Sequence, residues 1–185
     1  MKDSMIVSGY GGQGVLLIGQ IIAYAAVEVG LEVCWLPSYS TEMRGGTANC
    51  SVIVSQEPIA SPVVISPSLL IAMNQPSVDK YYSKIAPNGV LLFNGTDFNV
   101  NHPRDDVTVF CIPAAEMAEQ VGNLRGINMV FIGAYSALNE GLSKDSVHRI
   151  LDQMFSGDKQ VYAESNKQLV TMGYNFMQEV ISQKR

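Results

Sequence analysis

Residues 5–14 read Met5-Ile-Val-Ser-Gly-Tyr-Gly-Gly-Gln-Gly14, and this stretch decides how the chain begins to fold. The apolar run Met5 to Ser8 predicts a short buried strand, and a long apolar helix is expected to begin near Gln13. A glycine-rich turn separates the two. The order strand, glycine turn, helix is the setting in which a glycine pattern predicts a binding loop.

The glycines of this turn have a specific spacing. Gly9, Gly11 and Gly14 fall at the G-x-G-x-x-G positions, and Gly12 is added between them. Glycines let the backbone turn tightly and let a ligand or another chain approach without meeting a Cβ atom. The free amides at the start of the following helix favour an anion. The loop therefore indicates a site for a phosphate, a carboxylate or a closely docked partner loop.

The segment after the loop continues the same unit. Residues 15–29 are apolar on nearly every face, which predicts a helix covered on more than one side. Gly30 is a suitable stop, and Glu32 to Leu36 then predicts a second strand. This β–loop–α–β opening is Rossmann-like, favours parallel strand pairing, and indicates an α/β fold.

The remaining elements follow from periodicity and from breakers, within what we expect to be a single domain over residues 1–185. Prolines at 58, 62, 67 and 76 exclude a helix over residues 56–78, and Ser77 is expected to cap a helix that ends near Ile85. The other expected strands are 47–55, 69–73, 90–93 and 107–112, and the other expected helices are 114–121, 128–139, 143–155 and 163–183.

Charge and composition limit the choice of partners. The net charge is −5, which gives no reason to expect nucleic acid or an anionic membrane. Charged residues form 16% of the chain, against about 25% in typical domains. Positions 1–100 hold 11 of them and positions 101–185 hold 18. A charge-poor first half fits burial against another chain, and it fits equally well a first half that holds the central sheet.

Cysteines and hydropathy indicate the compartment. Cys34, Cys50 and Cys111 are far apart in the sequence, with no C-x-x-C, so zinc or iron–sulfur ligation by this chain is not expected. A reduced, cytoplasmic setting fits. Residues 4–27 are uncharged, but the glycines interrupt them and the apolar part is too short for a membrane span or a signal peptide.

Polar and glycine-rich loops are expected at the carboxyl ends of the strands, where open α/β sheets bind ligands. Arg44 could clamp a phosphate or a carboxylate, and Glu42 could hold Arg44 or accept from a partner chain. The alternative is an exposed ion pair of little energetic value. The candidate cofactor-binding or partner-facing residues are Gly9, Gly11, Gly12, Gln13, Gly14, Tyr39, Glu42, Arg44, Gly45, Gly46 and Asn74.

Several enzyme classes lose support at the residue level. A dinucleotide site needs an acidic residue near the end of the second strand, but that strand ends Cys34-Trp35-Leu36-Pro37. No lysine follows Gly14 as a phosphate-binding loop of the Walker type requires. His102 and His148 are isolated, and no Ser-His-Asp or Cys-His set can be assembled from them. We identify no complete catalytic set and no metal site in this chain.

Two motifs carry a resemblance to a known family. Gly9-Tyr-Gly-Gly-Gln-Gly-Val15 and Pro37-Ser-Tyr-Ser-Thr-Glu-Met-Arg-Gly-Gly-Thr-Ala-Asn-Cys-Ser-Val52 resemble the gamma subunit of 2-oxoacid:ferredoxin oxidoreductases, with the run 44–55 most similar to the 2-oxoglutarate type. That subunit corresponds to one domain of the single-chain pyruvate enzymes. The resemblance runs along the whole chain and includes Asn128. One departure is Ser40, where the family usually has glycine.

The resemblance implies a fold and a division of labour. The fold is a three-layer α/β sandwich with a curled, mixed sheet. The complexes decarboxylate a 2-oxoacid on thiamine diphosphate with magnesium, pass electrons through iron–sulfur clusters, and release an acyl-CoA made from coenzyme A. Those cofactors belong to the alpha, beta and ferredoxin-like delta subunits, so this chain is expected to carry none and to be inactive alone. Two alternatives stay open: a free-standing Rossmann-like dinucleotide-binding enzyme, and a CoA- or anion-binding module that uses Arg44.

Overall fold

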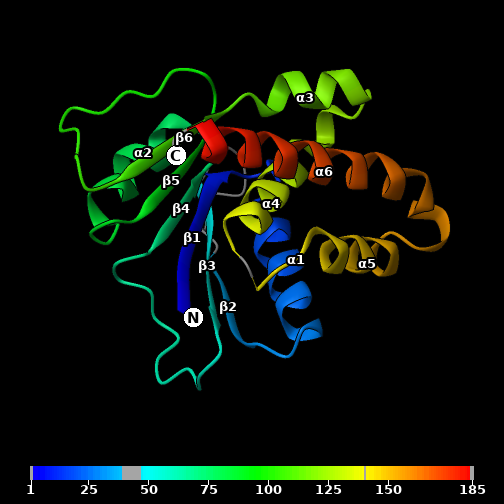
Figure 1. The fold of residues 1–185 in the computed structure, drawn as a ribbon, viewed down its shortest axis with the longest axis horizontal. Coiled ribbons are helices and arrows are strands. Elements are labelled where there is room, and N and C mark those ends of the chain that lie inside the picture. Colours follow the sequence, from blue (N-terminus) through cyan, green and yellow to red (C-terminus); the bar gives the residue numbers. More distant parts are fainter. Residues whose placement is uncertain (1, 39–46, 140, 184–185) are drawn as a thin grey trace.

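The computed structural model describes residues 2–38, 47–139 and 141–183, and these form a mixed six-stranded sheet with helices on both faces (Figure 1). The strand order is β2-β3-β1-β4-β5-β6. β1, β4, β5 and β6 are parallel, whereas β3 lies antiparallel between β1 and β2. The α/β class with a mixed sheet is confirmed. The strands are β1 (Lys2–Tyr10), β2 (Glu32–Ser38), β3 (Thr47–Ser55), β4 (Leu69–Ala72), β5 (Val90–Asn94) and β6 (Thr108–Ile112).

The parallel pairing expected for the opening unit is wrong. β2 does not pair with β1, because β3 returns between them, so that Met5 and Trp35 both lie opposite Val52. The physical reason is burial. β3 is apolar enough to occupy a central position, with its residues 52–55 buried, whereas Leu36 of β2 is 42% exposed and suits the edge of the sheet.

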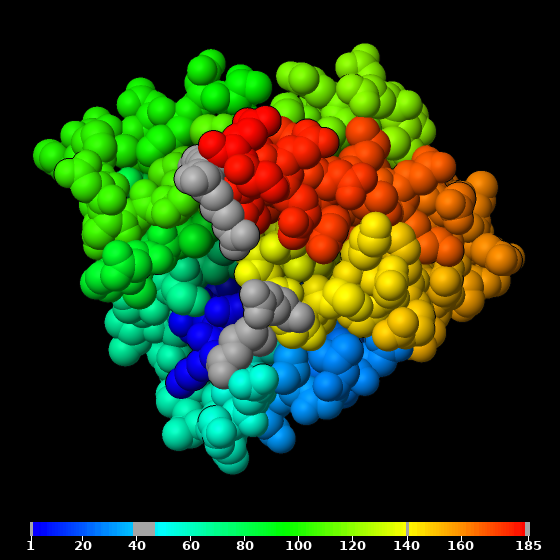
Figure 2. Space-filling model, in the orientation of Figure 1, coloured from blue at the N-terminus to red at the C-terminus, as the bar shows by residue number. Residues whose placement is uncertain are grey.

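Two hydrophobic cores lie on the two faces of the sheet. Met5 and Val7 point into the larger core, which α1, α3, α4, α5 and α6 complete, and Ile6 points into the smaller core under α2 and the 3-10 turn η1. Figure 2 shows α4, α5 and α6 (yellow to red) on one side of the molecule and the α2 region (green) on the other. The helices are α1 (Val15–Glu28), α2 (Gln75–Tyr81), α3 (Ala114–Val121), α4 (Ile127–Leu138), α5 (Lys144–Met154) and α6 (Gln160–Gln183), and η1 is Tyr82–Lys84.

The start of α2 corrects two of the sequence expectations. Pro76 lies in the first turn of α2, where its missing N–H leaves no bond unmade, so the proline did not exclude a helix. The cap is Asn74 rather than Ser77, because the Asn74 side chain accepts a hydrogen bond from the backbone N–H of Ser77 at 3.0 Å. The chain therefore enters the helix directly from β4.

Helix α1 is covered on several sides, as its all-round apolar sequence predicted. It packs against β2 and β3 and against α4 and α5. A Cβ atom on Gly19 would lie 2.6 Å from Sγ of Cys50 and 2.8 Å from the indole nitrogen of Trp35, so glycine permits this close approach. Burial raises the pKa of the Cys50 thiol from 9.0 to about 11, which leaves it an unreactive packing group. No helix in the described part of the chain is both long and apolar enough to cross a bilayer.

A buried polar cluster fixes the start of β1 to α4. The Asp3 carboxylate accepts hydrogen bonds from the Tyr135 hydroxyl at 3.1 Å and from the Asn139 side-chain amide. Tyr135 is almost fully buried. Desolvation, and then the neighbouring Asp3 carboxylate, raise the pKa of Tyr135 well above its ordinary value of 10.0.

This cluster predicts a stability loss in alkaline solution. Above about pH 10 the unfolded chain releases the Tyr135 proton while the folded chain keeps it, so the free energy of unfolding falls as the pH rises. Below pH 10 the residue contributes no pH dependence. A Tyr135→Phe variant should lose less stability than the wild type between pH 10 and 11 in urea titrations. Equal slopes in the two proteins would contradict the assignment.

Candidate functional site

The glycine loop between β1 and α1 is tied to the neighbouring strand by one side chain. Oε1 of Gln13 accepts from the Tyr10 backbone N–H at 2.6 Å and from Nδ2 of Asn74 at 3.2 Å. Nε2 of Gln13 donates to the Met73 carbonyl at 3.2 Å. The loop is thus closed on itself and fixed to the end of β4.

Gly9 is required by this arrangement. A Cβ atom there would lie 2.6 Å from Oε1 of Gln13 and 2.8 Å from Cβ of Met73. Both distances are shorter than Cβ contacts allow, so any larger residue would push Gln13 out of its position. The first glycine of the pattern therefore serves close packing between β1 and the end of β4.

Asn74 and Asn94 extend the same network to the third strand. Oδ1 of Asn74 accepts from the backbone N–H and the hydroxyl of Ser77, which caps α2. Nδ2 of Asn94, at the end of β5, donates to the Met73 carbonyl at 3.3 Å. The carboxyl ends of β1, β4 and β5 are therefore joined by side-chain amides, as the clustering of polar residues at these strand ends predicted.

The tip of the loop is open. A Cβ atom on Gly11 or on Gly12 would meet nothing within 4 Å, and both residues are exposed. Gly12 has φ +93°, a conformation that favours glycine. The adjacent Tyr10 side chain is 41% exposed. These residues form a bare backbone surface beside an aromatic ring, which suits a ligand or a partner chain.

The α1 N-terminus at the base of this loop has no cap. Gly14 occupies the cap position with φ 72°, no side chain caps the helix, and its first turn has no acidic residue. A Cβ atom on Gly14 would clash with the side-chain amide of Asn128, which lies in the first turn of α4. Asn128 is only 3% exposed, yet its Oδ1 has no hydrogen-bond partner. A buried acceptor oxygen without a partner indicates that a hydrogen-bond donor, such as an ordered water or a donor group of another molecule, completes the site.

The role of Asn128 was not predicted from the glycine pattern. It lies 114 positions after Gly14 in the sequence, and only the packing of α4 against α1 brings the two together. No local sequence pattern predicts a contact between residues so far apart. The sequence signal was limited to the presence of Asn128 among the residues that carry the family resemblance.

The second predicted loop cannot be placed. Tyr39, Glu42, Arg44, Gly45 and Gly46 lie outside the described residues, so their binding roles stay predictions. The strand residues on either side can be placed, since Thr47 lies opposite Tyr10 and Ser38 lies opposite Asn49. The chain thus leaves β2 and enters β3 at the end of the sheet that carries the glycine loop.

Gln13 gives a direct test of the loop's anchoring. A Gln13→Ala variant loses bonds to Tyr10, Asn74 and Met73, and we expect the free energy of unfolding to fall by about 1–2 kcal/mol. Amide hydrogen exchange should rise at the loop and at the start of α2. Gln13→Glu is the matched control, because its carboxylate can still accept from Tyr10 but cannot donate to Met73. An unchanged exchange rate in the alanine variant would contradict the anchoring role.

Outside this loop, His148 lies in a partly buried polar environment. Nε2 of His148 lies 3.3 Å from the Thr171 hydroxyl, and burial, followed by the charge of Lys167, lowers its pKa. Thr171 offers a hydroxyl and the Asp145 carboxylate acts on His148 through its charge, but among the residues described His148 has no hydrogen bond or ion pair with a carboxylate that would complete a catalytic set. In the same parts of the chain, no three His, Cys, Asp or Glu side chains gather closely enough to hold a metal ion.

Fold and site together define a class: an α/β chain with a bare, exposed glycine loop and an uncapped helix N-terminus behind it. The order of the strands weighs against a dinucleotide enzyme, because β3 separates β1 from β2 and so removes the strand that would hold the ribose. Residues 4–176 match the pyruvate ferredoxin/flavodoxin oxidoreductase family, and the chain belongs to that family.

Individual relatives give the range of this similarity. The chain is 34% identical over 176 residues to the ketoisovalerate oxidoreductase subunit VorA of Methanothermobacter thermautotrophicus, covering 95% of this chain but 36% of that subunit. The chain therefore spans about a third of the length of that relative. It is also 34% identical over 184 residues to the 2-oxoglutarate synthase subunit KorC of Methanocaldococcus jannaschii, covering 97% of this chain and 96% of KorC.

A solved structure supports the same placement. The 2-oxoglutarate:ferredoxin oxidoreductase of Magnetococcus marinus, solved with 2-oxoglutarate, coenzyme A and succinyl-CoA bound, matches with a TM-score of 0.87 and 25% identity. The match covers 96% of this chain and 31% of that one. The fold expected from the family resemblance is confirmed.

Proposed function

We propose that this chain is the non-catalytic gamma subunit of a cytoplasmic 2-oxoacid:ferredoxin oxidoreductase, and that the 2-oxoacid is 2-oxoglutarate. The observation that carries the proposal is the match to KorC, which covers nearly the whole of both chains. The partners are alpha, beta and ferredoxin-like delta subunits. They hold the thiamine diphosphate, the magnesium and the iron–sulfur clusters.

The glycine loop is the surface that we assign to these partners. Gly11 and Gly12 leave open space at the loop tip, and Tyr10 offers an exposed ring beside them. An exposed aromatic side chain next to bare backbone is typical of the buried centre of a protein interface. The predicted loop Tyr39 to Gly46 would join the same surface, since its flanking residues Ser38 and Thr47 lie at this end of the sheet.

The proposal is tested by purification under native conditions. A tagged copy expressed in its own host should elute in a large complex that contains a thiamine-binding chain and iron–sulfur clusters. That complex should oxidise 2-oxoglutarate in preference to pyruvate and ketoisovalerate when coenzyme A and ferredoxin are present. Elution as a free chain would contradict the subunit role, whereas a preference for another 2-oxoacid would contradict only the substrate.

A second role for the same loop is contact with the phosphates of coenzyme A. It is favoured by the uncapped α1 N-terminus, whose first N–H groups suit a phosphate and against which the Asn128 side chain lies. Asn128→Asp places a negative charge there and should raise the apparent KM for coenzyme A in the assembled enzyme by about tenfold or more. Arg44→Ala should also raise it. Unchanged KM values for coenzyme A in both variants would leave the loop with a partner role alone.

A further inference from the structure

A second surface lies beside η1, on the face of the sheet that α2 covers, opposite the face that α1 covers. It is a cavity of about 570 Å³ whose apolar lining includes Ile6, Val64, Tyr81 and Ile85. Ile6 and Tyr81 belong to the smaller core, so the floor of this cavity is continuous with the interior. A cavity of this size accommodates side chains of another molecule.

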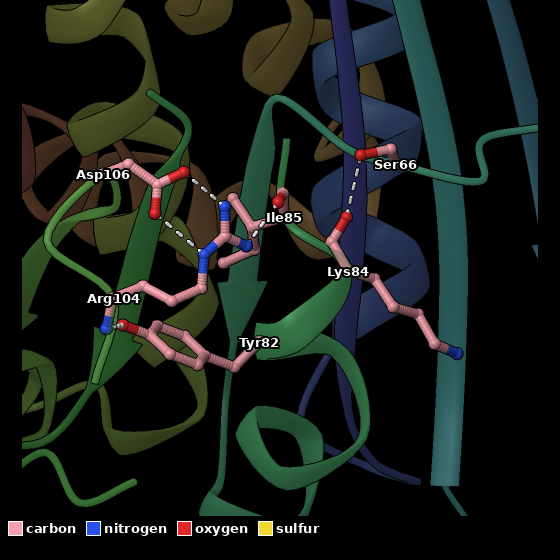
Figure 3. A network of polar contacts seen from close by, with 6 residues as sticks. All are labelled: Ser66, Tyr82, Lys84, Ile85, Arg104 and Asp106. Atoms are coloured by element: carbon pink, nitrogen blue, oxygen red, sulfur yellow. Dashed lines mark hydrogen bonds and ion pairs between the residues drawn. The ribbon is translucent and has the colours of Figure 1, made fainter. Parts of the chain in front are cut away.

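The walls of the cavity are held in place by hydrogen bonds (Figure 3). The Ser66 hydroxyl donates to the Lys84 carbonyl at 3.0 Å, which ties the segment before β4 to η1. Arg104 donates to both carboxylate oxygens of Asp106, at 2.9 and 2.6 Å, and to the Ile85 carbonyl at 2.6 Å. Bidentate pairing of this kind gives a fixed geometry, so the cavity is formed before anything binds.

Positive charge lies at the rim, on Lys84 of the cavity lining and on Lys80, which shares the Tyr81 ring with it. The ammonium groups of Lys80 and Lys84 each lie 5.1 Å from the centroid of the Tyr81 ring. Within the described residues neither lysine forms an ion pair, whereas Arg104 is neutralised by Asp106. The chain as a whole has a net charge of −5, so two unpaired lysines on one aromatic ring form a local exception. Such a rim attracts carboxylates.

The other side of the cavity is a strap, residues 61–66, that leaves backbone and apolar groups uncovered. The side chains of Val63 and Ile65 are 63% and 80% exposed. In this part of the described chain, neither the N–H nor the C=O groups of Val64 and Ile65 have hydrogen-bond partners. Residues 61–66 belong to no strand, and residues 65 and 66 lie in a bend, so this backbone is not paired within the sheet. Its unpaired N–H and C=O groups can form hydrogen bonds with the backbone of a bound peptide.

We propose that this cavity and its strap bind an extended, acidic segment of a partner polypeptide. The apolar side chains of the segment enter the cavity, its carboxylates lie against Lys80 and Lys84, and its backbone forms hydrogen bonds with the free N–H and C=O groups of Val64 and Ile65. A small carboxylate would satisfy the lysines but would leave Val63 and Ile65 exposed. The observations therefore favour a polypeptide. This surface is separate from the glycine loop and does not depend on the identity of the complex.

The test uses the full, isotope-labelled chain and two defined peptides. One is acetyl-Val-Glu-Val-Asp-Leu-amide, and the other is its uncharged isostere acetyl-Val-Gln-Val-Asn-Leu-amide. We expect amide shift changes to gather in residues 63–66 and 81–85. At low salt the acidic peptide should bind about tenfold more tightly than the isostere, and added salt should remove the difference.

Variants separate the cavity from general charge effects. Lys80→Gln combined with Lys84→Gln should abolish the preference for the acidic peptide, and both residues are exposed, so the fold is retained. Lys144→Gln is the matched control, because its ammonium group also lies over a tyrosine ring, 5.3 Å from that of Tyr174. The control should keep the preference. Absence of shift changes, equal binding of the two peptides, or loss of the preference in the control would each overturn the proposal.

Discussion

A Gly133→Ala variant is expected to lose about 3 kcal/mol of its free energy of unfolding, the largest single effect that we expect from one methyl group in this chain. Gly133 of α4 faces α6 so closely that an added Cβ would overlap the Val170 carbonyl and lie 2.9 Å from the Tyr174 backbone nitrogen. These are backbone atoms, which cannot move aside as a side chain can. The two helices would have to separate.

The expected loss of stability is opposite in sign to the intrinsic preference of helices for alanine over glycine, so the two effects are easy to tell apart. In an exposed helix interior, alanine is favoured over glycine by about 1 kcal/mol. Gly173→Ala should behave like Gly133→Ala, since its Cβ would overlap the Val130 carbonyl on the reciprocal side of the crossing. Gly11→Ala serves as the control and should be neutral, because that site is open. Urea denaturation measures all three, and a stabilised Gly133→Ala protein would show that the helices do not cross so closely.

A Gly11→Leu variant should fold normally and fail to assemble. In the isolated chain a side chain at Gly11 meets no atom within 4 Å, and its φ lies outside the glycine-favouring range, so stability should change by less than about 0.5 kcal/mol. In a complex where another subunit covers the loop, the leucine should weaken association by about 10- to 100-fold. Sedimentation or light scattering with the purified partner subunits measures the difference.

The matched control for this experiment is Gln160→Leu. Gln160 is exposed at the start of α6 and is far from the glycine loop in the fold (Figure 1), so the same side chain there should leave assembly unchanged. Normal assembly of the Gly11→Leu protein would remove the loop from the interface. Loss of folding in that variant would contradict the open geometry of the loop tip.

Local signals in the sequence predicted most individual elements. Glycines and prolines mark their ends, so α3 lies at 114–121 as expected, and Gly30 follows α1 closely. The order of the strands could not be predicted this way. The strand order depends on how the strands pack together in the core. β3 lies next to β1 because its apolar residues are buried in a central position of the sheet.

The positions of the glycine loop and of Asn74 were predicted, their binding role stays a prediction, and the contacts that join them were not predicted. The glycine spacing located the loop, and the polar strand ends located Asn74 beside it. The sequence did not reveal that Gln13 bonds to Met73, or that Asn128 lies against Gly14, since both contacts join residues more than fifty positions apart. Such contacts arise from tertiary packing and leave no periodic trace in the sequence.

The central claim is that this chain acts by docking to partner subunits that perform the chemistry. A reconstituted assay from which subunits are left out in turn tests this claim most directly. Reduction of ferredoxin by 2-oxoglutarate and coenzyme A is measured with this chain alone, with the partner subunits alone, and with all of them. We expect no turnover by this chain alone and full activity only when all subunits are present. Turnover of 2-oxoglutarate by the isolated chain would contradict the account.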